Sequence, residues 1–355
     1  MSDRKRVALL FGGRSGEHEV SVRSAESVAE GLERDHDVVC ILIEKTGRWH
    51  LQDGSRPHAT GGEAIFLAPD PTDGGTLRRF DDAVSLVRPD VFFPVLHGPY
   101  GEDGTLQGLF DLAGVPYVGA GVAASAAAMD KTLMKSLFAQ AGLPQVRHRT
   151  LRSRDASLEA RVLDDLGLPV FVKPASLGSS VAVSKVPTAE ALGAALGLAL
   201  EYDHKVVIEE AVDAREIEVA VLGNEGAEPS VPGEIVPDRE FYDYDSKYAA
   251  DSATKLIIPA PVDEPTAAEV RRLAVEAFAA VDACGLARVD FFLERSSGRV
   301  LVNEINTMPG FTSISMYPRL WAASGVSYPE LLARLVALAL TRHSRRATLR
   351  TDFGR

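Results

Sequence analysis

The first third of the chain alternates short apolar runs with one helical pattern. Residues 7–11 and 38–43 are apolar runs of strand length, and 21–32 between them repeats apolar residues at helical spacing. A further apolar run, 91–95, ends just before a glycine-rich stretch. Strands that alternate with helices predict an open α/β layer. Residues 47–75 are rich in Gly, Pro, Asp and Thr, which predicts loops around a short apolar insert at 64–68.

The remaining two thirds mix helices and strands in a different order. A new unit is expected after the small-residue stretch 119–128, and we expect a helix at 129–141 because Gly142 and Pro144 follow it. The tail from Thr341 is rich in arginine and is expected to fray. The order is typical of a compact α+β domain followed by a closing unit. The pattern predicts strands at 169–173, 181–185, 206–210 and 216–222, and helices at 188–202, 265–283 and 328–340.

The segment 286–312 has the pattern of a hairpin with one polar face. A turn centred on Ser297 places Asp290 opposite Glu304 and Arg288 opposite Asn306. Strand alternation then brings these four side chains to one face. Two carboxylates and an amide oxygen are ligands suited to Mg²⁺, and an arginine beside them favours an anionic substrate. The alternative is an amphipathic hairpin with a solvated polar face, and a slip of one residue would distribute the group over both faces.

Two glycine-rich turns follow predicted strands. In 11–19 the backbone could approach a ligand, and Glu17 would suit an ammonium group. A dinucleotide site is the rival, with Glu44 as the ribose acid, but the spacing is not G-x-G-x-x-G. Glu17 could also be a plain helix cap. In 173–180 a lysine precedes a Gly-Ser loop, which is typical of a phosphate cradle without a Walker motif; an ordinary hairpin turn would explain the loop but not Lys173.

Further polar positions fit a nucleotide and a sheet edge. Acids within 207–210 and 216–219 are unusual in strands, although solvated strand faces are the commoner explanation. A nucleotide could use the backbone at 210–212 for adenine and Glu216 for the ribose. The glycine-rich segment 97–104 ends a strand, at the edge where open α/β sheets bind ligands.

Composition limits the classes of function. With 38 basic and 50 acidic residues, the formal charge of −12 gives no electrostatic footprint for nucleic acid. The apolar run that follows Arg6 is too short for a signal peptide or a membrane span, so we expect a cytoplasmic protein without a membrane partner. Cys40 and Cys284 lack metal-ligand spacing and are expected to be buried thiols.

Taken together, the sequence resembles the D-alanine:D-alanine ligases of the ATP-grasp superfamily over nearly its whole length. The segments that carry the resemblance are 12–21, 97–104, 129–131, 173–180, 209–216, 241–248 and 288–316. The resemblance implies α/β and α+β content in a three-domain ATP-grasp fold. It implies an N-terminal open parallel α/β domain at 1–125, a central ATP-grasp domain at 126–235, and a C-terminal domain at 236–355 that carries an ω-loop and the Mg²⁺ site.

The same resemblance assigns residues to roles. The ATP-binding set would be Lys131, Lys173, Glu209, Glu210, Val212, Glu216, Phe241, Lys247 and Asn303. Two Mg²⁺ (or Mn²⁺) ions would be held by Asp290, Glu304 and Asn306, with Glu304 bridging them. The catalytic set would be Glu17, Ser179, Tyr248, Arg288 and the Gly310 backbone N–H. The amino acid substrates would contact Glu17, His97, Ser315 and Met316.

The implied reaction is ATP-dependent ligation of two D-alanines through a D-alanyl phosphate, for peptidoglycan precursor synthesis, in a homodimer. D-serine or D-lactate as second substrate is the alternative, and the Lys247-Tyr248 pair favours D-alanine. Other ATP-grasp ligases lack the set Glu17, Tyr248 and Ser315. A regulatory module without catalysis would be expected to have lost part of the hairpin group, and an NAD-dependent oxidoreductase disagrees with the glycine pattern.

Overall fold

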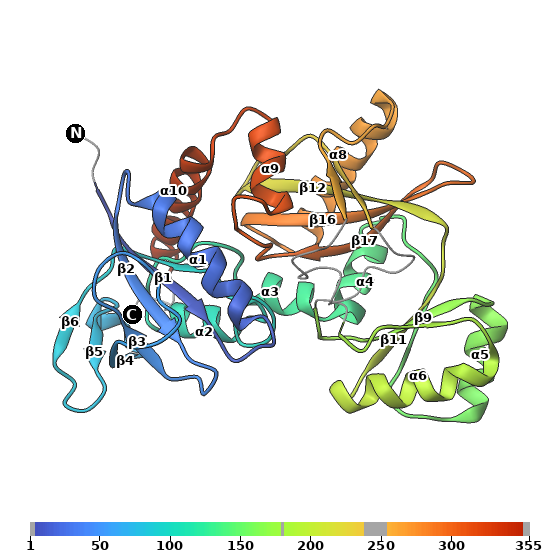
Figure 1. Cartoon of the computed structure of the whole chain (residues 1–355), viewed down its shortest axis with the longest axis horizontal. Coiled ribbons are helices and arrows are strands. Elements are labelled where there is room, and N and C mark those ends of the chain that lie inside the picture. The colour runs from blue at the N-terminus through green and yellow to red at the C-terminus, as the bar shows by residue number, and fades with distance from the viewer. Residues whose placement is uncertain (1–3, 179–180, 238–253, 351–355) are drawn as a thin grey trace.

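The computed structural model describes residues 4–178, 181–237 and 254–350, arranged around three separate sheets (Figure 1). The first sheet has the strand order β6-β5-β4-β3-β2-β1-β7. Its parallel part consists of β1 (Arg6–Gly12), β2 (Asp37–Ile43) and β7 (Val91–Pro94), with α1 (His18–Leu32) after the first strand. These elements confirm the α/β pattern predicted for the beginning of the chain.

The predicted loop region 47–75 contains two strands of this sheet, one of them at the predicted apolar insert 64–68. It contributes β3 (Trp49–Leu51) and β4 (Glu63–Leu67), which continue into β5 (Leu77–Arg79) and β6 (Ser85–Val87), all antiparallel. The expected open parallel sheet is therefore mixed. Strands of three to five residues are too short to show an alternating pattern among so many turn residues, and pairing along the edge of β2 forms them.

A chain of short helices leads out of the first sheet. These are α2 (Thr105–Leu112), α3 (Val122–Met129) and α4 (Lys131–Gln140). The small-residue stretch is thus helix α3, and the expected helix at 129–141 begins two residues later, at Lys131. Asp130 causes the break, because its backbone is extended and its carboxylate accepts hydrogen bonds from the N–H groups of Thr132 and Leu133.

The second sheet is small, antiparallel and covered on one face. It has the order β10-β9-β11-β8, from β8 (His148–Leu151), β9 (Val170–Pro174), β10 (Ser184–Val186) and β11 (Val206–Glu210). Helices α5 (Ala156–Leu166) and α6 (Ala189–Tyr202) cover the face that buries Val170, Val172 and Ile208. Helix α4 lies on the opposite side of this sheet (Figure 1). Alternate residues of β9 and β11 therefore face α4.

The third sheet carries the predicted hairpin. Its order is β15-β14-β12-β16-β17, and β13 (Glu228–Pro229) pairs with the central strand β12 (Ala214–Gly223). The other strands are β14 (Gly233–Val236), β15 (Lys255–Ile257), β16 (Gly285–Glu294) and β17 (Val300–Asn306). Helix α8 (Glu264–Ala280) covers one face. Helices α9 (Met316–Ala323) and α10 (Tyr328–Ala347) pack between the other face and α1, in a core shared with the first sheet.

The C-terminal segment is helical rather than frayed as far as Ala347. Arg342 donates to Tyr117 O and Cys284 Sγ at 3.1 and 2.7 Å, and stacks over the Tyr117 ring. Arg346 donates to Asp111 at 2.7 Å. The arginines bind elements of the first sheet's layer, which a local pattern cannot reveal.

The cysteine and membrane expectations can be compared with the fold. Cys40 is buried, and burial raises the pKa of its thiol to about 12, whereas Cys284 is partly exposed. Across the described ranges, no single helix has the length and apolar character needed to cross a bilayer. The pair α9 and α10 passes that test only together, with a bend of 105° between them.

Candidate active site

The hairpin brings the four predicted polar residues together. Arg288 pairs with Asn306 and Asp290 with Glu304 across β16 and β17, as expected. Nearer the turn the pairing is shifted by one residue, with Leu293 opposite Val300, and an irregularity after Asp290 restores the expected register. The irregularity falls at Asn303, which is partly exposed like its neighbour Glu304.

Arg288 is fixed between two carboxylates. Its Nε and Nη2 donate to the two oxygens of Asp290, each at 2.6 Å, and Nε lies 3.1 Å from Glu218 Oε2. Burial opposes the charge, but Asp290 and Glu218 together raise the pKa of Arg288 well above its usual value. Sequence reasoning did not assign Glu218 a role. The signal available was its place two residues after Glu216 on a strand, and β12 places it directly opposite Asp290.

The donor atoms on this face fit Mg²⁺. Asn306 donates its Nδ2 to Asp290 Oδ2 at 3.0 Å, so its amide oxygen is not used in that bond. Asp290 and Glu304 face each other on paired strands. Within the described part of the chain, no cluster of three His, Cys, Asp or Glu side chains is placed to hold a metal. Two carboxylates and an amide would therefore need oxygens from a ligand or from water, which is the usual coordination of Mg²⁺ in phosphate sites.

Opposite this face lies a group of lysines from α4 and β9. Lys131 Nζ donates to Leu177 O at 2.6 Å, and Lys173 Nζ lies 2.6 Å from Glu209 Oε2. Burial lowers the pKa of Lys131, although Glu304 acts against the shift. For Lys173, burial is outweighed by Glu209 and Glu304, so its pKa is raised. Glu304 thus lies within electrostatic range of both lysines.

A further lysine, Lys135, was not predicted. It lies one turn after Lys131 on α4, and its Nζ is 2.9 Å from Glu209 Oε1. Burial would raise the pKa of Glu209, but Lys135 and Lys173 lower it to about 2. The spacing of four residues from Lys131 was the signal in the sequence.

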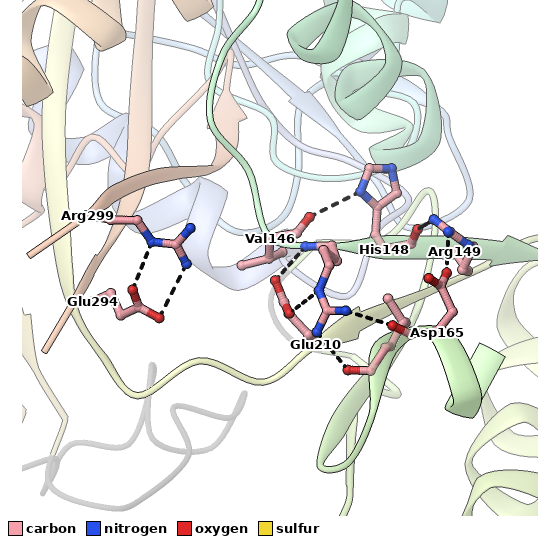
Figure 2. Close-up of polar contacts among 9 residues, drawn as sticks. Val146, His148, Arg149, Asp165, Glu210, Glu294 and Arg299 are labelled. Carbon is pink, nitrogen blue, oxygen red and sulfur yellow. Dashed lines mark hydrogen bonds and ion pairs between the residues drawn. The ribbon is translucent and has the colours of Figure 1, made fainter. Parts of the chain in front are cut away.

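The acid next to Glu209 has a different environment. Glu210 Oε1 accepts from Arg147 N at 2.8 Å, and Oε2 accepts from Arg147 Nε at 2.6 Å; Figure 2 labels Glu210 and draws these bonds as dashed lines. The N–H groups of Glu210 and Ala211 donate to Arg147 O and Pro169 O at 3.0 and 3.1 Å. The side chain of Glu210 is therefore engaged by Arg147, and Val212 is the next predicted position along the chain.

The N-terminal glycine turn meets two other predicted loops. The distances from Glu17 Oε2 to Cβ positions built on Gly98 and Gly178 would be 3.1 and 3.8 Å. Glu17 occupies the N-cap position of α1, but its side chain makes no capping hydrogen bond, so the capping alternative is not borne out. Ser15 Oγ accepts from Glu17 N at 3.2 Å and donates to His97 O at 2.6 Å. Three segments far apart in the sequence thus converge on one carboxylate.

His97 and Glu102 line the same corner. His97 Nδ1 bonds Met308 O at 3.0 Å, and its buried Nε2 has no hydrogen-bond partner among the described residues. Burial lowers the pKa of His97, against the effect of Glu17. Glu102 accepts from Gly98 N at 2.8 Å, and burial together with Glu17 raises its pKa to about 8. Glu102 was not predicted as a site residue, although an acid within a glycine-rich loop was the signal.

The segment after β17 ends in a helix N-terminus. Ser315 occupies the N-cap position of α9 and its N–H donates to Thr312 O at 2.9 Å, whereas the N–H of Met316, the first residue of the helix, is placed to bind a carboxylate. Ser315 Oγ accepts from Thr312 N at 3.1 Å. A Cβ built on Gly310 would lie 3.1 Å from that Oγ, which places the two predicted residues side by side.

The remaining predicted residues are only partly placed. Glu216 is partly exposed on β12 and acts electrostatically on Lys173. Asn303 Oδ1 is buried and has no hydrogen-bond partner within the described ranges. Ser179, Phe241, Lys247 and Tyr248 lie outside the described residues.

Two cavities lie among the residues around the first sheet. One of about 740 Å³ is lined by residues around Trp49 and Phe80, away from the groups above. A second, of about 300 Å³, is lined in part by Gly13, His97 and Tyr100 and borders the site. The charged groups described above therefore lie outside the 740 Å³ cavity.

Comparison with known proteins identifies the family. The family model described as D-ala D-ala ligase N-terminus matches residues 6–120, and the one described as D-ala D-ala ligase C-terminus matches 137–337. The chain belongs to the D-alanine–D-alanine ligase family. The D-alanine–D-alanine ligase of Heliobacterium modesticaldum is 51% identical over 95% of both chains.

Solved ligases share the fold. The D-alanine-D-alanine ligase from Coxiella burnetii has a TM-score of 0.83 at 36% identity and covers 97% of both chains. The VanG D-Ala:D-Ser ligase from Enterococcus faecalis has a TM-score of 0.85 at 32% identity, covering 95% of this chain and all of the other. These comparisons confirm the predicted ATP-grasp fold and the membership of a ligase family that uses ATP. They do not support the oxidoreductase or regulatory alternatives.

Proposed function

We propose that the chain joins two D-alanine molecules at the expense of ATP and so supplies D-alanyl-D-alanine for peptidoglycan precursors. One observation carries the proposal beyond family membership. Glu304 acts electrostatically on Lys131, Lys173, Arg288 and Glu102, which come from all three layers of the fold. A phosphoryl-transfer site needs this convergence of cationic groups and metal-binding carboxylates.

The nucleotide would lie between the second and third sheets. Lys131 and Lys173 would bind its phosphates, and Glu216 and Asn303 its sugar and phosphate groups. The adenine edge would use the backbone from Glu210 to Val212, since Arg147 occupies the Glu210 carboxylate, and Glu209 would act on the phosphates through its contact with Lys173. Phe241 and Lys247 complete the proposed ATP set. Two Mg²⁺ (or Mn²⁺) ions at Asp290, Glu304 and Asn306, with Glu304 shared, would supply charge compensation for the phosphates.

The chain's residues then divide the work on the amino acids. Glu17 would hold the ammonium group of the first D-alanine, with His97 beside it. The carboxylate of this D-alanine attacks the γ-phosphorus of ATP and displaces ADP. The second D-alanine would place its carboxylate at Ser315 and the Met316 N–H. Its amine, after losing a proton, attacks the carbonyl carbon of the acyl phosphate. Arg288 and the Gly310 N–H would stabilise the resulting oxyanion before phosphate leaves. Ser179 and Tyr248 would complete the triad with Glu17.

D-alanine is favoured as the second substrate. The relative that is 51% identical is named a D-alanine–D-alanine ligase, whereas the solved D-Ala:D-Ser ligase is 32% identical. The Lys247-Tyr248 pair also matches the D-alanine-adding pattern. We therefore place D-serine and D-lactate behind D-alanine as acceptors.

A single coupled assay tests the proposal. The purified chain is supplied with ATP, Mg²⁺ and D-alanine, and release of ADP and phosphate is followed while the dipeptide is measured by mass spectrometry. D-serine and D-lactate are compared as acceptors at equal concentration. We expect ATP turnover only with a D-amino acid and D-alanyl-D-alanine as the main product. The absence of phosphate release with D-alanine and Mg²⁺ would refute the ligase proposal.

The organisation around this activity is also a proposal. We propose the domain limits 1–125, 126–235 and 236–355, and a homodimer in the cytoplasm, as the family resemblance implies. Light scattering at assay concentrations measures the oligomeric state. A monomer with full activity would contradict the dimer without affecting the ligase assignment.

A further inference from the structure

Lys135 is a buried cation to which the proposed reaction gives no role. Its side chain is 1% exposed, and its Nζ lies 2.9 Å from Glu209 Oε1. Burying an ammonium group costs several kcal/mol before pairing, and fully buried lysines are rare. The site therefore maintains this charge against a substantial cost, which calls for a function.

Glu209 connects Lys135 to a second lysine. Its other oxygen, Oε2, lies 2.6 Å from Lys173 Nζ, and the Glu209 side chain is 4% exposed. Glu209 pairs with Phe171 on β9, and Lys173 pairs with Val207 on β11, so both charged residues face α4. The three side chains form a continuous buried chain from helix α4 through β11 to β9.

The charges along this chain do not balance. Within it, Lys135 and Lys173 contribute two positive charges and Glu209 one negative charge, while Glu304 and Glu216 act on Lys173 from outside the chain. Glu209 divides its attraction between Lys135 and Lys173, one oxygen to each. Without Lys135, the carboxylate would pair with Lys173 alone and neutralise the cation that the phosphates require. Lys135 therefore acts on the nucleotide without touching it.

We infer that Lys135 is a positioning residue for ATP, which holds Glu209 in place and keeps the charge of Lys173 free for the phosphates. The inference rests on the proposed ATP site. The opposing interpretation is a static ion pair that stabilises the fold alone. The two interpretations differ in which ligands respond, because a change in the charge of Lys173 affects phosphates, whereas a loosened fold affects every part of the nucleotide.

The test replaces the charge with an apolar side chain of similar length, Lys135→Met. Steady-state kinetics give kcat and the KM values for ATP and D-alanine, and titration calorimetry gives the affinities for ADP and adenosine. We expect the KM for ATP and the Kd for ADP to rise about tenfold or more, since one pairing at this depth exceeds the 1.4 kcal/mol that a factor of ten represents. The adenosine affinity and the KM for D-alanine should change less than about threefold.

Arg147→Met is the matched control. Arg147 pairs with Glu210, which follows Glu209 on β11, but the side chain of Arg147 is 58% exposed, so this pair is not part of the buried chain. Its loss should leave the ATP-to-adenosine ratio unchanged. Lys135→Arg, which retains the charge, should recover part of the ATP affinity that the methionine variant loses.

Three outcomes would overturn the inference. These are an unchanged KM for ATP, an equal loss of ADP and adenosine affinity, and failure of both the methionine and arginine variants to fold, which would assign Lys135 to folding. The proposed function fails differently. In that case the unsubstituted protein would not turn over ATP with D-alanine, while the calorimetric comparison of ADP with adenosine would still report on Lys135.

Discussion

The pKa values of two glutamates in the candidate site are shifted in opposite directions. Glu209, between Lys135 and Lys173, has its pKa lowered to about 2, whereas Glu102, near Glu17, has its pKa raised to about 8. Burial opposes ionisation at both positions, so the neighbouring charges decide the outcome. The site is therefore divided into a lysine-rich half suited to phosphates and an acid-rich half suited to ammonium groups. A ligase for amino acids that uses ATP needs both halves.

Glu304 lies where the two halves meet, so its loss should have the largest effect. Glu304→Gln keeps the shape and removes the charge that acts on Lys131, Lys173, Arg288 and Glu102. We expect kcat to fall by about 10²- to 10³-fold or more, because charge stabilisation of the transition state is lost. Steady-state turnover and far-UV circular dichroism measure activity and fold.

The matched control for Glu304 is in the same hairpin. Glu294 pairs with Arg299 next to the turn, at the opposite end of the hairpin from Arg288 and Asn306, and Figure 2 shows the pair. Glu294→Gln should retain close to full activity. If Glu304→Gln were as active as Glu294→Gln, the assignment of the metal ions to Glu304 would be wrong. The charge of Glu304 would then not be needed by either half of the site.

The acid-rich half can be tested separately at Glu17. Glu17→Gln removes the charge proposed to bind the ammonium group, and we expect the KM for D-alanine to rise about tenfold to a hundredfold, the range for a lost charge-assisted hydrogen bond. The KM for ATP should stay within about twofold. Glu19→Gln, which alters an exposed acid on the same helix paired with Lys45, is the control. A parallel rise in the KM for ATP would mean that the site is not divided in this way.

The smallest effect is on stability and concerns Glu102. Because its pKa is raised from 4.5 to about 8, the folded protein retains a proton that the unfolded chain releases above pH 4.5. The stability that this proton provides is complete below about pH 4.5 and is lost as the pH rises through about 8. The slope is at most about 1.4 kcal/mol per pH unit, and less for this partly exposed side chain.

Glu102→Gln should remove this pH dependence. Urea denaturation at several values between pH 5 and 9 should show the variant gaining stability relative to the unsubstituted protein as the pH rises. Asp103→Asn is the control. Asp103 lies in the same loop and accepts hydrogen bonds from the backbone N–H groups of Tyr100 and Thr105. Parallel curves for Glu102→Gln and the unsubstituted protein would show that Glu102 ionises normally.

Sequence reasoning succeeded where the chemistry is local. The hairpin face, including Asp290 opposite Glu304, follows from a turn signal and strand alternation over about 20 residues. It failed where strands are short or where a partner is distant. Strand β3 was taken for a loop, β5 and β6 were not predicted, and the C-terminal arginines were expected to fray although Arg342 and Arg346 bind residues near the first sheet.

The sequence by itself determined the family and the polar face of the hairpin, and it predicted most of the candidate ligand-binding positions, because these depend on residue identity and on spacing within one element. Only the tertiary structure decided how those positions are charged. The pairing of Glu209 with two lysines, the position of Glu218 beside Arg288 and the environment of Glu102 each join separate segments of the chain. Electrostatic energies depend on distance and burial, and packing alone sets both.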